Sequence, residues 1–286
     1  MSLKLMQDEL PTMSEREFCE AAAVCRSTMR YERRPESAFD LEVKGKVREM
    51  VKKHPGWGAP LVTQRLKKLG YKVNHKRIEG QWDDECLQAM RKITKSRKKT
   101  GAPYQREIEA KAPNHVWTCD FMFERTRHGR TLKIMTLVDE YTREALAVHV
   151  DDKINADGVR RVLAKVMETR TAPAHLRTDN GPEFIAEALK GWLRDQGTDL
   201  MNVDPGSPWQ NGYIESFNGT LRWEVFDREV FGSKTEMQVV LEWWRQTYNR
   251  VRPHSSLENN TPEEYAMAAS ASLQRPSHPR NPCSDN

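Results

Sequence analysis

The sequence predicts an α/β domain with a mixed five-stranded sheet and flanking helices, preceded by small helical modules. Two observations predict this class. After residue 113, three strand-like segments follow one another, and strands then alternate with helical segments, an order typical of an α/β sheet. Before residue 91, apolar residues recur every three to four positions, which is typical of amphipathic helices.

The composition is that of a globular protein. Of its residues, 37% are hydrophobic and 30% are charged. Its length of 286 residues is enough for one large domain and a smaller one. No apolar run approaches the roughly 18 residues of a membrane span, and the first residues lack a signal-like apolar segment. The five cysteines show no CxxC spacing, which argues against disulfides and structural zinc. We therefore expect a cytoplasmic protein without a membrane partner.

Basic residues are concentrated in the amino-terminal third. Residues 44–111 hold 19 Lys and Arg against 7 Asp and Glu, whereas residues 112–267 hold 19 against 24. A basic segment alone is most often a solvated surface. Because the asymmetry lies within one chain, it favours binding to nucleic acid.

Residues 1–41 predict a helical hairpin. Ser14 is placed to cap its first helix, and Glu17, three residues later, completes a capping box. Arginines follow at positions 30, 33 and 34, as in a helix-turn-helix whose second helix meets DNA. A hairpin that only packs on the rest of the protein is the alternative.

Residues 42–90 predict a second helix-turn-helix-like module, which is a candidate for DNA binding. Two helical runs flank a turn at residues 54–60, and Gly70 is placed to end the second run. Its polar face carries Lys67, Lys68, Lys72, Lys76 and Arg77. Residues 91–111 form a basic linker that we expect to be flexible when free and to follow a phosphate backbone when bound. The linker's candidate DNA contacts are Arg97, Lys98 and Lys99.

Residues 112–267 predict the sheet domain. Strands at 116–124 and 131–139 form a hairpin, and a third strand follows at 144–150. The remaining expected elements are helix 155–169, strand 174–178, helix 183–196, strand 198–203, and helices 209–227 and 235–249. The tail 268–286 is rich in Ala, Ser, Pro and Asn, which predicts disorder.

Three carboxylates of this domain are candidate metal ligands. Asp120 lies in the first strand, Asp179 ends the fourth, and Glu215 follows a turn-rich segment. If the first and fourth strands are neighbours, the two aspartates meet at one sheet edge. Clustered carboxylates repel unless cations bind them, and oxygen-only ligands suit Mg²⁺ or Mn²⁺. Two such ions about 4 Å apart support in-line displacement at phosphorus.

Each carboxylate also has an ordinary interpretation, since a strand Asp is often a turn residue and a helix Glu often faces solvent. The settings favour function. Asp179 precedes Asn180-Gly181-Pro182, a turn that leaves backbone donors available. Glu215 lies near a helix start, and Arg222 follows two turns later on the same face, where it is placed to meet a phosphate.

Four motifs carry a resemblance to a known family. They are Trp117–Phe121, Thr178–Phe184, Pro205–Gly219 and Tyr248–Leu257, and 35 residues separate Asp179 from Glu215. In these motifs the chain resembles the downstream-frame (OrfB-type) transposases of two-frame bacterial insertion sequences, a branch of the retroviral-integrase-like DDE superfamily. The resemblance extends from about residue 42 to 266.

This resemblance implies an RNase H-like core in which Asp120, Asp179 and Glu215 bind two Mg²⁺ or Mn²⁺ ions. It implies donor-strand cleavage by water and strand transfer by the liberated 3′-hydroxyl, with Arg222 contacting DNA. It also implies a homo-oligomer on the element's terminal inverted repeats and target DNA, and an upstream-frame (OrfA-type) partner or fusion. Arg252 and His254 lie in the fourth motif, but no role for them follows.

Two alternatives remain open. Cys86 stands where the family's pattern has a helix-ending glycine, and acidic residues at 83–85 dilute the basic face. A catalytically inactive DNA-binding regulator or remnant of the same element is therefore one alternative. An RNase H-like nuclease that only hydrolyses DNA is the other. A strand-transfer assay with Mg²⁺ on a matched DNA end distinguishes the three functions.

Overall fold

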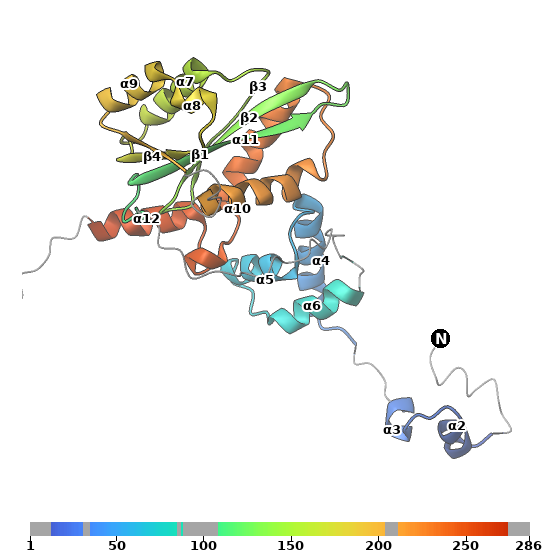
Figure 1. Ribbon diagram of the computed structural model, residues 1–286. Helices are drawn as coiled ribbons and strands as arrows, with labels where there is room; N and C mark the ends of the chain where they lie inside the picture. The colour runs from blue at the N-terminus through green and yellow to red at the C-terminus, as the bar shows by residue number, and fades with distance from the viewer. Residues whose placement is uncertain (1–12, 31–34, 85–86, 88–107, 204–210, 274–286) are drawn as a thin grey trace, which may run out of the picture. The chain divides into compact units, whose positions relative to one another are not determined.

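The computed structural model describes residues 13–30, 35–84, 87, 108–203 and 211–273 (Figure 1). The chain divides into two units, Met1–Lys46 and Val47–Asn286. Cys86 and the linker residues Arg97, Lys98 and Lys99 lie outside the described residues. No helix in the described ranges is both long enough and apolar enough to span a membrane.

The first unit contains the expected helical hairpin, α2 (Glu15–Ala21) and α3 (Arg26–Met29). The predicted capping box is confirmed: the Ser14 hydroxyl accepts from the Glu17 amide at 3.3 Å, and the Glu17 carboxylate accepts from the Ser14 amide at 2.8 Å. Phe18, Cys19 and Met29 form a small buried cluster between the helices. The hairpin is thus present, and its binding to DNA stays a prediction.

The next helices are α4 (Ala38–Lys53), α5 (Ala59–Lys68) and α6 (His75–Asp84). Gly70 follows α5 with φ +89°, a left-handed conformation that glycine adopts without steric cost. α5 packs against α6; α5 buries Val62 and Leu66, and α6 buries Ile78 and Trp82.

The sheet is mixed and five-stranded, as predicted. Its strands are β1 (Val116–Arg125), β2 (Thr131–Asp139), β3 (Ala145–Asp151), β4 (His175–Thr178) and β5 (Asp199–Asn202). They are arranged in the order β3-β2-β1-β4-β5. β1 pairs antiparallel with β2 and parallel with β4. This order places the first and fourth strands side by side, the condition on which the predicted site depends.

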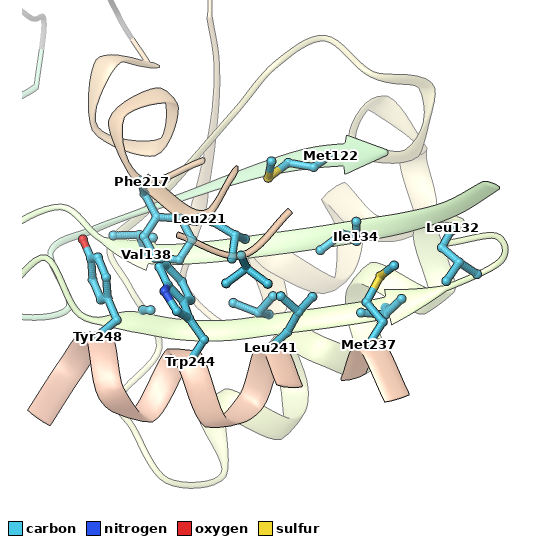
Figure 2. Packing of buried hydrophobic residues seen from close by; sticks show 14 of the residues in the cluster. Met122, Leu132, Ile134, Val138, Phe217, Leu221, Met237, Leu241, Trp244 and Tyr248 are labelled. Atoms are coloured by element: carbon cyan, nitrogen blue, oxygen red, sulfur yellow. The ribbon is translucent and has the colours of Figure 1, made fainter. Parts of the chain in front are cut away.

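Helices cover both faces of the sheet (Figure 1). On one face lie α7 (Ala156–Met167), α8 (Pro182–Ile185) and α9 (Glu187–Asp195); on the other lie α10 (Gly212–Leu221) and α11 (Lys234–Arg250). Figure 2 shows side chains of α10 and α11, including Phe217 and Trp244, packed with Met122 of β1. Because strand side chains alternate between faces, Asp120 shares this face with Met122.

Two helices differ from the sequence predictions. The helix expected at 183–196 is two helices, because Ala186 adopts an extended conformation between them. The helix expected at 209–227 begins, in the described part, at Gly212 and changes to a π-helix at Arg222–Phe226. Residues 204–210 lie outside the described residues.

The prediction of disorder from residue 268 is wrong for the first part of the tail, since α12 runs from Pro262 to Leu273. Its start forms a capping box, in which the Thr261 amide donates to Glu264 at 2.8 Å and the Glu264 amide to the Thr261 hydroxyl at 3.3 Å. Pro262 suits a first helical position, and the alanines that follow favour the helix. Residues 274–286 lie outside the described residues.

Candidate active site

The register of β1 and β4 brings two of the predicted carboxylates together. Thr118 of β1 pairs with Arg177 of β4, and the two strands are parallel. Asp120 lies two residues after Thr118 and Asp179 two residues after Arg177, so both lie in the same direction from this pair. β4 ends at Thr178, and Asp179 therefore opens the loop beside the middle of β1.

Asp120 is held by two hydrogen bonds. Its Oδ1 accepts from the Phe121 amide and its Oδ2 from Asn218 Nδ2, both at 2.8 Å. Asn218 Oδ1 accepts in turn from the Thr136 hydroxyl of β2 at 3.0 Å. Sequence reasoning missed Asn218. Its position three residues after Glu215, on the same face of α10, was the available signal.

Asp179 lies in the tight turn that the sequence predicts. Its Oδ1 accepts from the Gly181 amide at 3.0 Å, and Asn180 Nδ2 donates to the Val203 carbonyl at 2.8 Å. A Cβ at position 181 would stand 3.0 Å from Asp179 Oδ1. The turn thus orients the carboxylate and favours glycine two residues after it.

A partly buried ion pair ties this loop to the sheet. Lys133 of β2 is only 8% exposed and pairs with Glu183, four residues after Asp179. Phe184 stacks on Phe121 with ring centroids 4.9 Å apart, and Lys133 Nζ lies 3.7 Å from the Phe121 ring centroid. Sequence reasoning missed Lys133 too, although a lysine inside an apolar central strand was a usable signal.

Glu215 lies in the first turn of α10 and is exposed. The helix start is anchored by the Thr118 hydroxyl of β1, which donates to Asn211 Oδ1 at 2.7 Å, and α10 packs against β1 and β2. Burial is the largest cause that raises the pKa of Asp120 to about 6, and the negative charges of Asp179 and Glu215 contribute to the same rise. The other two predicted carboxylates therefore both act electrostatically on Asp120.

The donor chemistry of these residues fits a hard divalent cation. Three carboxylates offer only oxygen ligands, and a cation would relieve the repulsion that raises the pKa of Asp120. Within the described ranges, no group of three His, Cys, Asp or Glu side chains converges as a metal site. The carboxylate oxygens thus agree with the sequence prediction of Mg²⁺ or Mn²⁺ binding. The assignment of Asp120, Asp179 and Glu215 as the metal ligands stays a proposal.

The predicted DNA-contacting residues have varied surroundings. Arg222 begins the π-helix with its side chain 47% exposed, and its Nη1 lies 3.3 Å from Glu124 Oε2. Lys68 pairs with Glu264 of α12. Lys67 and Lys76 are exposed, and Arg77 is half-buried. Contact of any of them with DNA stays a prediction.

Comparison with known proteins shows the family. Two models described as integrase core domain match residues 110–208 and 196–262. The transposase of insertion sequence element IS904 from Lactococcus lactis is 26% identical over 234 residues, covering 77% of this chain and 91% of that protein. An uncharacterized 31.7 kDa protein of insertion element IS407 from Burkholderia multivorans is 34% identical over 270 residues, covering 94% and 96%. The chain belongs to the insertion-sequence transposases with an integrase core domain.

A solved structure agrees with this family in fold. A chain of the simian T-cell lymphotropic virus intasome, in complex with PP2A regulatory subunit B56 gamma, superimposes with a TM-score of 0.50 at 15% identity. The superposition covers 85% of this transposase-family chain and 78% of the intasome chain. The mixed sheet with helices on both faces is therefore the integrase-like, RNase H-like fold that the sequence motifs imply.

Proposed function

We propose that the chain is a DNA transposase subunit that cleaves the donor strand of its insertion sequence and joins the free 3′-hydroxyl to target DNA. Asp120, Asp179 and Glu215 would be its catalytic, metal-binding triad. The observation that carries this proposal is the pairing of β1 with β4, which sets Asp120 and Asp179 beside each other. The bond from Asn218, on the helix of Glu215, to Asp120 supports it.

Each residue near the triad has a task in this proposal. Asn218 and the Phe121 amide hold the two oxygens of Asp120, and the Gly181 amide orients Asp179. Two Mg²⁺ or Mn²⁺ ions, when bound, would supply activation of the attacking hydroxyl and stabilisation of the leaving oxygen. The carboxylates of the triad would hold these ions, and bound cations would keep Asp120 ionised at neutral pH.

The proposed partner is DNA, both the terminal inverted repeats and the target. Its support is the charge asymmetry of the chain and the exposure of Lys67, Lys76 and Arg222. A homo-oligomer on DNA is proposed from the fold likeness to a chain of an intasome. The OrfA-type partner or fusion rests on the sequence resemblance alone.

A strand-transfer assay tests the function. The substrate is a duplex carrying the inverted repeat found beside the reading frame, with Mg²⁺ or Mn²⁺ and a target plasmid. We expect joined products from the unmodified chain and at least a hundredfold loss with Asp179→Asn or Glu215→Gln. Asp199→Asn is the matched control, because that carboxylate lies on β5 with its side chain 80% exposed.

The outcomes separate the alternatives. Joining retained by Asp179→Asn or Glu215→Gln contradicts the triad. Binding to the repeat without cleavage, under conditions in which a related transposase is active, supports the regulator or remnant. Cleavage without joined products supports a nuclease that only hydrolyses.

A further inference from the structure

A pocket lies along α10, the helix that carries Glu215. Its volume is about 500 Å³, within the usual range of about 300–1,000 Å³ for sites that hold a small molecule or a nucleotide. Buried apolar side chains of β2, α10 and α11 contribute to its lining: Val138, Phe217 and Tyr248. The pocket is therefore large enough for one nucleotide and too large for a phosphate ion alone.

The pocket contains a cation held in a strained backbone conformation. Arg143, in the turn between β2 and β3, has φ +62°, a left-handed conformation that costs a residue with a side chain about 1–2 kcal/mol. Its guanidinium lies 3.3 Å from the ring centroid of Tyr213 and donates to the Glu140 carbonyl. No carboxylate in the described part of the chain forms an ion pair with Arg143.

Glycine would adopt this conformation without steric cost. The presence of arginine here is therefore best explained by a function of its positive charge. Strained residues of this kind are concentrated at ligand sites, because selection for stability alone would remove them. The side chain lines a pocket that touches the helix of Glu215. Binding of a negatively charged ligand at this position would explain why an arginine occupies it.

The other polar groups of the pocket also suit an anion that bears a ring. Gly212, at the start of α10, contributes the positive end of the helix dipole. Four serine and threonine residues line the pocket: Ser216, Thr220, Ser255 and Ser256. Arg252 also lines it, but Glu224 matches that charge at 2.8 Å. Among the described residues that line the pocket, Arg143 is thus the cation available to a ligand phosphate.

His254 adds a neutral group. It is 7% exposed, packs edge-on against Tyr248 with ring centroids 4.5 Å apart, and its Nε2 has no hydrogen-bond partner among the described residues. Burial lowers the pKa of His254 to about 3, so the ring is neutral at physiological pH. The motif that contains Arg252 and His254 thus forms one wall of the pocket.

We propose that this pocket holds one unstacked nucleotide of a DNA strand, with its phosphate against Arg143 and the start of α10 and its base among Tyr213, Phe217 and Tyr248. The proposal rests on the proposed function, because it places a DNA strand beside Glu215. Aromatic rings and a cation are the groups with which proteins hold single-stranded bases and their phosphates.

The test is titration of the full chain with thymidine 3′,5′-bisphosphate, followed by calorimetry in a chelating buffer that prevents catalysis. We expect Arg143→Gln to weaken binding at least tenfold. Arg130→Gln is the matched control, because Arg130 is exposed and pairs with Asp152. Arg143→Gly is a second variant that relieves the strain; we expect it to unfold at the same or a higher temperature and still to lose the nucleotide.

Two further probes decide the class of ligand. Thymidine and inorganic phosphate should each bind at least tenfold more weakly than the bisphosphate. Inorganic phosphate bound as tightly as the bisphosphate would reduce the pocket to an anion site and overturn the nucleotide. Unchanged binding in Arg143→Gln and Arg143→Gly would overturn the pocket, as would a failure of the unmodified chain to bind the bisphosphate.

Failure of this proposal differs from failure of the proposed function. Asp179→Asn should bind the bisphosphate like the unmodified chain while it loses strand transfer. Strand transfer without bisphosphate binding contradicts the proposal that the pocket holds a nucleotide, and it still supports the transposase function. Bisphosphate binding that depends on Arg143, in a chain that joins no DNA, supports the pocket and contradicts the transposase function.

Discussion

Replacing Asp120 by asparagine should make the protein more stable at neutral pH while it abolishes strand transfer. Asp120 carries a charge in a largely buried position, and burial together with Asp179 and Glu215 raises its pKa from 3.8 to about 6. A carboxyl group whose pKa is higher in the folded than in the unfolded state binds its proton more tightly when folded. Stability therefore falls as the pH rises from about 4 through 6.

The magnitude follows from the two pKa values. The change from 3.8 to about 6 corresponds to about 3 kcal/mol of unfolding free energy at pH 7.5, where both states are ionised, and to about 1 kcal/mol at pH 4.5. Asparagine cannot ionise and avoids this cost. It keeps the acceptor for the Phe121 amide, and Asn218 can turn its amide so that Thr136 and position 120 remain hydrogen-bonded.

Urea unfolding of Asp120→Asn and the unmodified chain, in parallel from pH 4.5 to 7.5 without divalent cations, measures this difference. We expect the variant to exceed the unmodified chain by up to about 3 kcal/mol at pH 7.5 and by about 1 kcal/mol at pH 4.5. Asp199→Asn is the control and should show no such trend, because Asp199 is exposed. A stability difference that does not change with pH would refute the reasoning.

Three further predictions concern the same site. Mg²⁺ should stabilise the unmodified chain by up to about 2.7 kcal/mol at a hundred times its Kd, which is measured as a rise in melting temperature. The rise should be much smaller for Asp120→Asn, and equal rises would contradict the ligand assignment. Asn218→Ala removes a bond that lowers the pKa of Asp120, so the acid limb of the strand-transfer pH profile should move to higher pH, and an unmoved limb would contradict this role. Lys133→Met leaves Glu183 without its buried partner and should lower stability by about 2–4 kcal/mol in urea unfolding. The same variant should need a higher Mg²⁺ concentration for half-maximal joining. The control Lys190→Met breaks an exposed pair and should show neither effect.

Much of the fold was predictable because its signals are local. Short apolar runs bounded by turn residues place each strand within about one residue of its observed bounds, and the capping box of Ser14 and Glu17 involves only four consecutive positions. The failures have physical causes as well. The extended conformation of Ala186 and the π-helical turn at Arg222 have no strong signature, because tertiary packing overrides local propensity there.

The carboxylates of the candidate site were predictable, but their surroundings were not. Asp120 and Asp179 stand in recognisable motifs, and their meeting requires only that β1 and β4 be neighbours. The contact of Asn218 with Asp120 joins residues 98 positions apart, and that of Lys133 with Glu183 joins residues 50 apart. Such contacts depend on strand order and helix rotation, which a single sequence does not show.

The sequence by itself determined which segments along the chain are strands and which are helices, the turn around Asp179 and the residue types of the site, because these depend on neighbours a few positions apart. Only the tertiary structure decided which groups hold Asp120, how far burial raises its pKa, and that Arg143 shares a pocket with Tyr213 and His254. Burial, charge repulsion and pocket shape are properties of chain segments packed together, and they exist only once the sheet and its helices have assembled.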